Sequence, residues 1–144
     1  MKKVFDWKSC IEQRFVKSVM IDVERIASLV GSAQDRERTA DILPINNMTK
    51  ETVVSLEYDV LRELLEAIAL QQGYKIYNHE CFTYFLRTVI KDERFAEEFD
   101  SLRTLRNAIN YYGKRILLSD AQRAIADIKK LTSLTRKMLH QKLL

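Results

Sequence analysis

Hydrophobic residues recur every three or four positions along most of the chain, which is the spacing of one face of an α-helix. The longest of these stripes predicts a helix that begins at the N-cap Thr49 and stops at Gly73. Two acidic residues near its start, Glu51 and Glu57, suit the positive end of a helix dipole. Its wide apolar face consists of Val53, Leu56, Val60, Leu61, Leu64, Leu65 and Ile68.

A weaker stripe at the N-terminus predicts a helix over residues 6–18, within an N-terminal extension of residues 1–20. Asp6 is its expected N-cap. The apolar positions of this helix are Trp7, Cys10, Ile11, Phe15 and Val19.

The next helix is predicted to begin at Asp22. Residues 32–41 are mostly polar, so we expect this part of the helix to be a solvated extension that Pro44 ends. The positions expected to face inward are Val23, Ile26, Val30 and Ala33.

The C-terminal half predicts three more helices after a connector over residues 74–79. A short fourth helix follows Asn78 as its cap, and a fifth runs from about Phe95 to Tyr112. Gly113 then suits the left-handed residue that ends many helices, and Ser119 is the expected cap of the last helix. The apolar positions of the fourth and last helices are Phe82, Phe85, Leu86, Val89, Ile125, Ile128, Leu131, Leu134 and Met138.

Composition supports this reading, because three glycines and one proline leave few residues for tight turns. Short connections favour antiparallel neighbours. We therefore expect an all-α fold, an up-and-down helical bundle of five to six helices, in a single domain over residues 1–144. Aromatic residues of the fourth helix are expected in the core rather than in a base-stacking platform.

The sequence also predicts a compartment. Cys10 and Cys81 are far apart and fit no ligand spacing, so they read as buried thiols of a reduced, cytoplasmic protein. The first residues lack the apolar core of a signal peptide, and no apolar run approaches the roughly 20 residues of a membrane span. We therefore expect no membrane association.

Charge is distributed unevenly along the chain. Residues 51–100 carry 5 Lys and Arg against 11 Asp and Glu, whereas residues 101–144 carry 10 against 2. In one interpretation the cationic final third packs on the acidic middle helices. In the other it is an electrostatic footprint for a polyanion such as RNA.

Several kinds of site have no support in the sequence. His79 and His140 lie on different elements without Cys or carboxylate at ligand spacing, so we expect no metal and no cofactor. The isolated glycines form no phosphate-binding loop, and no Ser, Cys or Thr has a visible base partner.

The end of the fifth helix gathers the candidate chemistry. At 100° per residue, Arg106 lies at the edge of the apolar arc, with its stem partly buried and its guanidinium beside two asparagines. A guanidinium binds phosphate or carboxylate through two parallel hydrogen bonds. The candidate residues around Arg106 are Arg103, Asn107, Asn110, Tyr111, Tyr112, Lys114 and Arg115.

A purely structural role for Arg106 is the alternative. The arginine would then form a salt bridge to a carboxylate of the third helix, such as Glu57, Glu63 or Glu66.

Two segments are similar to the HEPN superfamily (higher eukaryotes and prokaryotes nucleotide-binding domains), small all-α proteins. One is Gly73-Tyr-Lys-Ile-Tyr-Asn-His-Glu80, and the other is Leu105-Arg-Asn-Ala-Ile-Asn-Tyr-Tyr-Gly113. The order of helices from about Asp22 onward also resembles the family. In that connector, Tyr74 and Tyr77 either pack on the bundle or line a cleft.

The resemblance implies a site and an activity. The family signature is an arginine, a polar residue, three residues of any kind and a histidine, and active members are metal-independent endoribonucleases. Arg106 and Asn107 match the first two positions, but Tyr111 takes the place of the histidine. Tyrosine, with an ordinary pKa of about 10, is a poor base at neutral pH. The implied catalytic set of Arg106, Asn107 and Tyr111 is therefore degenerate, with weakened or lost cleavage.

The resemblance also implies partners, either a second copy of the chain or a nucleotidyltransferase-type antitoxin. The binding residues expected beside the catalytic set are Arg103, Asn110, Tyr112, Lys114 and Arg115. Three hypotheses follow: an RNA-directed HEPN-like protein, a mononucleotide-binding domain, and a non-catalytic helical interaction module.

Overall fold

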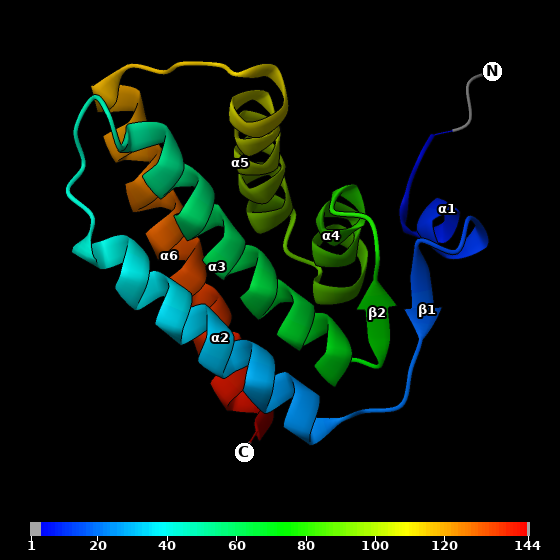
Figure 1. The fold of residues 1–144 in the computed structure, drawn as a ribbon. Helices are drawn as coiled ribbons and strands as arrows, with labels where there is room; N and C mark the ends of the chain where they lie inside the picture. Colours follow the sequence, from blue (N-terminus) through cyan, green and yellow to red (C-terminus); the bar gives the residue numbers. More distant parts are fainter. Residues whose placement is uncertain (1–3, 144) are drawn as a thin grey trace.

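The computed structural model describes residues 4–143, with side chains described for residues 4–139. Three long helices, α2 (Val23–Ile42), α3 (Lys50–Gln71) and α6 (Leu118–Leu143), pack side by side, with α3 in contact with both others (Figure 1). Helix α5 (Glu93–Tyr112) also packs against α3, and α4 (Glu80–Phe85) packs against α5. The predicted all-α bundle is confirmed.

Helix α3 is the centre of the core. Of its predicted apolar positions only Leu56 is half-buried, and the others are buried. Aromatic side chains from α4 and α5 cover its other side, where Phe82, Phe85 and Phe99 are almost fully buried. The aromatic residues of the fourth helix are therefore mostly core residues, as expected.

Most predicted helix ends are confirmed by capping contacts. Asp22 accepts a hydrogen bond from the backbone N–H of Arg25, and Asp6 does the same for Ser9 at the start of α1 (Trp7–Glu12). Gly113 ends α5 with φ 65°, a left-handed conformation that glycine adopts without strain. Helix α5 begins slightly earlier than predicted, because Asp92 caps it.

Two predicted caps act differently. The hydroxyl of Thr49 donates to the carbonyl of Pro44 and accepts from the N–H of Asn46, so it closes the preceding loop instead of capping α3. Helix α6 begins at Leu118, so Ser119 lies inside its first turn. The side chain of Asn78 accepts from the N–H of Glu80, but the N-cap of α4 is His79, so the predicted cap is wrong by one residue.

The predicted helix over residues 6–18 is wrong beyond Glu12. Arg14 has φ 63°, and the chain then forms strand β1 (Val16–Ser18). This strand pairs antiparallel with β2 (Tyr74–Ile76), inside the segment that we expected to be a connector. Pairing with a strand far along the chain outweighs the local helical spacing, because it lets Val16 and Ile76 bury their side chains together.

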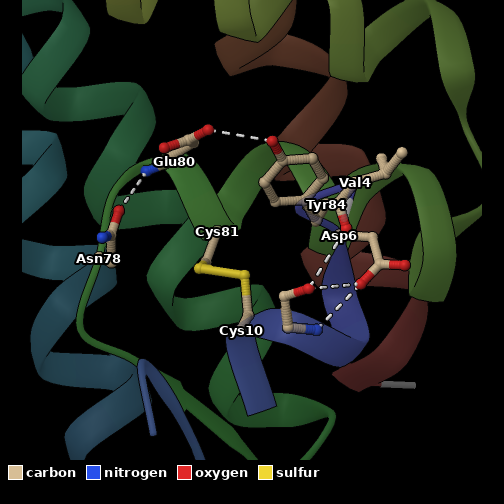
Figure 2. The surroundings of a disulfide bond; sticks show 8 residues. Val4, Asp6, Cys10, Asn78, Glu80, Cys81 and Tyr84 are labelled. Carbon is tan, nitrogen blue, oxygen red and sulfur yellow. Dashed lines mark hydrogen bonds between the residues drawn. A yellow bond between two sulfur atoms is a disulfide. The ribbon is translucent and has the colours of Figure 1, made fainter. Parts of the chain in front are cut away.

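The cysteines form a disulfide, so the expectation of reduced thiols is wrong. Cys10 on α1 and Cys81 on α4 are bridged, with their Cα atoms 6.1 Å apart, a normal separation for a disulfide (Figure 2). Both are fully buried, which agrees with the prediction. The bridge fastens the N-terminal arm (residues 4–18) to α4, and Trp7 adds ring contacts with Tyr74 and Phe85.

The extension expected to be solvated over residues 32–41 is mostly exposed, as predicted, and ion pairs hold it along one side. Arg36 pairs with Glu63 at 2.5 Å, and Glu37 pairs with Arg136 at 2.6 Å. At the start of the same helix Val23 is 66% exposed, so its predicted inward position is wrong. After α4, a π-helical turn (Leu86–Ile90) leads into α5.

Candidate functional site

Arg106 is the centre of the candidate site. Its side chain is 13% exposed, and its Nη2 lies 3.3 Å from the Oδ1 of Asp59 on α3. The guanidinium carbon is 5.4 Å from the ring centroid of Tyr58 and 5.8 Å from that of Tyr111, and Nη1 donates to the Tyr111 hydroxyl at 3.3 Å. The guanidinium is thus held by two tyrosine rings and one carboxylate, with its stem buried as predicted.

The salt bridge from Arg106 to the third helix is confirmed in kind, but the three proposed partners are wrong. Glu57 contacts Lys129 of α6 and Glu63 contacts Arg36 of α2, so both face the other helices. Glu66 pairs with Arg62 and Lys75, the latter on strand β2. Asp59 alone among these acidic residues pairs with α5.

Two polar atoms of this cluster are buried without a hydrogen-bond partner. They are the hydroxyl of Tyr58, whose residue is fully buried, and Nε of Arg106. Burial raises the pKa of Tyr58, against the opposing charges of Arg106 and Arg103. The hydroxyl therefore stays neutral beside a cluster of cations.

His79 is a member of the cluster that the sequence did not single out. Its ring lies 6.5 Å from that of Tyr58 between centroids. Burial, followed by the positive charges of Arg62 and Arg106, lowers the pKa of His79 to about 4. The imidazole is therefore neutral at pH 7, and three arginines with one tyrosine share its surroundings. The three arginines are Arg62, Arg103 and Arg106.

Two other predicted residues of α5, Arg103 and Asn110, have partners other than Arg106. Arg103 pairs with Asp100 one turn earlier at 2.9 Å. Asn110 exchanges hydrogen bonds with Ser55 of α3. Asn107 is half-buried. The expectation of a guanidinium flanked by two asparagines is therefore replaced by one flanked by two tyrosines.

The end of α5 forms an exposed surface. Tyr111 and Tyr112 are 69% and 84% exposed, and Lys114 and Arg115 follow Gly113 on the same stretch. A shallow hollow of about 340 Å³ lies beside them, lined by Met48, Glu51, Ile109, Gly113, Lys114 and Arg115.

Charge at this exposed surface is only partly balanced. Arg115 pairs with Glu51 at 3.1 Å, and the backbone N–H of Ile116 donates to the same carboxylate. Within the described residues, no ion pair joins Lys114 to a carboxylate. The surface thus combines exposed aromatic rings with a lysine that is free to meet an anion.

The site residues that were not predicted from the sequence show only a weak pattern in it. Asp59 and Arg62 are three positions apart, so they share one side of α3. That side of α3 lies away from Glu57. Tyr58 belongs to the same side, next to the apolar positions. The connector that ends at His79 was singled out only for its family resemblance.

No group of residues in the described part of the chain has the make-up of a metal site. None of its helices is long and apolar enough to cross a membrane. Comparisons with models of protein families, with curated proteins and with solved structures found no match.

Proposed function

We propose that this protein is a HEPN-like domain that binds RNA at the C-terminal end of α5, with weak or lost metal-independent ribonuclease activity. The observation that carries the proposal is the pairing of a held arginine with exposed rings: Arg106 lies against Tyr111, and Tyr112 and Lys114 follow it. Unpaired RNA bases stack on exposed aromatic side chains, and cations contact the phosphates between them.

The chemistry of the site favours binding over cleavage. A phosphate oxygen that approaches Arg106 competes with Asp59, whose contact of 3.3 Å is long for a charged hydrogen bond. The Tyr111 hydroxyl is placed to donate to the same phosphate. His79 stays neutral but is half-buried, with its ring 6.5 Å from that of the buried Tyr58, so it replaces the missing motif histidine only if the site opens.

Fluorescence anisotropy with labelled single-stranded RNA tests the proposal. We expect Tyr112→Ala to weaken binding about tenfold, since stacking on one ring contributes about 1–3 kcal/mol per base. Arg106→Lys keeps the charge but loses the two-pronged geometry, so it should weaken binding as well. Incubation with tRNA in the presence of a chelator, with Arg106→Ala as reference, measures any residual cleavage.

A matched pair of surface arginines supplies the control. Arg115 and Arg123 are 71% and 73% exposed, and each forms one ion pair. Arg115→Ala should weaken RNA binding, whereas Arg123→Ala should not. Equal affinities for the two variants, or no binding of RNA by the wild type, would contradict the proposal.

A non-catalytic interaction module is the second candidate. The observation in its favour is the contact of Arg106 with Asp59, which gives the arginine a structural partner. In that case Arg106→Ala destabilises the fold, and one protein copurifies specifically. If Arg106→Ala leaves stability intact and abolishes binding of RNA, this candidate is excluded. A thermal shift with ATP or GTP that disappears in Arg106→Lys would instead favour a mononucleotide ligand.

Partners and compartment belong to the same proposal. A homodimer, or a pair with a nucleotidyltransferase-type antitoxin, places the α5 surface at a shared cleft, and light scattering with the copurified partner tests this. We also propose a cytoplasmic location. Disulfides are rare in the reducing cytosol, so the redox state of Cys10 and Cys81 in rapidly alkylated cells is the discriminating measurement.

A further inference from the structure

The β1–β2 ribbon has two different faces. Val16 and Ile76 are directly opposite each other, and each is 4% exposed, so they form the inner face on the core. Side chains alternate along a strand, which places Lys17 and Lys75 on the outer face. Tyr77, two residues after Lys75, continues that face and is 58% exposed.

The outer face places like charges together. Lys17 and Lys75 are register partners, and like charges directly opposite each other destabilise a ribbon. Both ammonium groups lie over the ring of Tyr77, at 5.5 Å and 5.7 Å from its centroid. The ribbon therefore holds two cations around one accessible ring. Their repulsion destabilises the ribbon, and packing of the inner face does not require it.

The protein neutralises the positive charge of this face only in part. Glu66 contacts both Lys75 and Arg62, so a single carboxylate serves two cations. Lys17 forms no ion pair with a carboxylate in the part of the chain that the structure describes. A net positive charge is left beside an exposed tyrosine.

We infer that the outer face of the ribbon, formed by Lys17, Lys75 and Tyr77, is a second contact for single-stranded RNA. The inference rests on the proposed function, because it extends the same strand beyond the end of α5. One base stacks on Tyr77 while the lysines contact the adjoining phosphates. The site selects an oligonucleotide over a mononucleotide.

The spacing of two points along α3 gives the length of RNA that reaches both the end of α5 and the ribbon. Asn110 of α5 contacts Ser55, and Lys75 of the ribbon contacts Glu66, eleven residues further along α3. At 1.5 Å per helical residue the two contacts are about 16 Å apart. A stacked strand advances about 3.4 Å per nucleotide, so roughly five nucleotides span them. A trinucleotide is therefore long enough to reach only one of the two surfaces, the end of α5 or the ribbon.

Anisotropy with fluorescein-labelled oligouridines, a trinucleotide and a decanucleotide, tests the inference. We expect Tyr77→Ala to weaken binding of the decanucleotide about tenfold and Tyr77→Phe to restore it, because the ring is kept. Lys17→Ala should make the slope of log affinity against log salt shallower by about 0.7, the value for one lost phosphate contact. Neither change should alter binding of the trinucleotide.

Lys8→Ala is the matched control, since Lys8 is an 82% exposed lysine of the same N-terminal arm. It should leave both affinities unchanged. If the wild type binds neither oligonucleotide, the proposed function fails. If it binds both but the ribbon variants match Lys8→Ala, only the second contact is wrong. Equal weakening of both oligonucleotides by Tyr77→Ala also overturns it, because the ribbon would then be the first contact.

Discussion

The two sides of α3 hold buried charge in opposite ways. Toward α2 and α6, Glu57 is 1% exposed and contacts Lys129 at 3.2 Å, while Lys129 also contacts Asp41 at 2.6 Å. Burial raises the pKa of Glu57 to about 7, against the opposing charge of Lys129. Toward α4 and α5, burial and then the positive charges of Arg62 and Arg106 lower the pKa of His79 to about 4.

The two sides of α3 differ in how much of their charge is already paired within the protein. On the first side the cations of α6 already contact carboxylates of α2 and α3, which agrees with the interpretation that the cationic final third packs on acidic helices. That side leaves little charge for a ligand. On the second side the cations outnumber their carboxylates near the ribbon and at the end of α5. The two proposed RNA contacts therefore both lie on the second side.

Removing the disulfide should have the largest effect. Cys10 and Cys81 are separated by 71 residues in sequence, and the chain-entropy model gives about 4 kcal/mol for a closed loop of that length. We expect reduction, or Cys10→Ser with Cys81→Ser, to lower the free energy of unfolding by about this amount. Urea unfolding with and without reductant measures it.

The double variant is its own control, because reductant should not change it further. Hydrogen exchange should show the largest gain in opening at the N-terminal arm and α4, the two elements that the bridge joins. A loss below about 1 kcal/mol would show that the bridge adds little to stability.

The next effect concerns pH on the first side. Glu57 has a folded pKa of about 7, above the ordinary 4.5, so its contribution to stability is complete below pH 4.5 and is lost as pH rises through 7. The loss is about 3 kcal/mol at most. Glu57→Gln should therefore gain stability relative to the wild type at pH 8 but not at pH 4.5. Urea midpoints at the two pH values measure this gain.

The exposed ion-paired residue Glu98 provides a comparison, and Glu98→Gln should shift the two midpoints equally. If Glu57→Gln shows the same pH dependence as the wild type, the buried carboxyl does not titrate as the structure indicates.

A smaller effect of opposite sign is expected on the second side. His79 has a folded pKa of about 4, below the ordinary 6.5, so its contribution is complete above pH 6.5 and is lost as pH falls toward 4. Partial exposure reduces the effect to about 2 kcal/mol. His79→Gln should remove this acid loss. A thermal melt series from pH 4 to pH 7 compares it with the wild type.

Between pH 4.5 and 6.5 the two slopes oppose each other, so the wild type should show a flatter dependence than either variant. A wild-type slope as steep as that of Glu57→Gln would contradict the comparison of the two sides.

Sequence periodicity predicted what depends on neighbours along the chain. The long stripe of α3, the cap at Asp22 and the stop at Gly113 are local features, and each is confirmed. The helical spacing of apolar residues that begins at Trp7 continues past Glu12 in the sequence, but the helix itself ends at Glu12. Ile11 is 46% exposed, and the chain turns at Arg14 without the glycine that usually marks such a turn.

The remaining features depend on contacts between distant segments. Spacing alone gives no reason to join Cys10 to Cys81, because the two residues are 71 positions apart and meet only in the folded chain, where β1 also pairs with β2. The partner of Arg106 depended on the rotation of α3 about its axis, which turns Asp59 toward α5 and Glu57 away from it. At 100° per residue, these two carboxylates lie on nearly opposite sides of one helix.

The Cys10–Cys81 bridge also makes the redox environment of the protein measurable after one backbone cut. The covalent ring that it closes contains α2 and α3 but not α5 or α6. Ile42 and Met48, 81% and 82% exposed, mark an accessible cleavage region inside that ring. A chain cut there runs as one band on a denaturing gel without reductant and as two bands with it, so a single nick reveals whether the molecule came from an oxidising or a reducing environment.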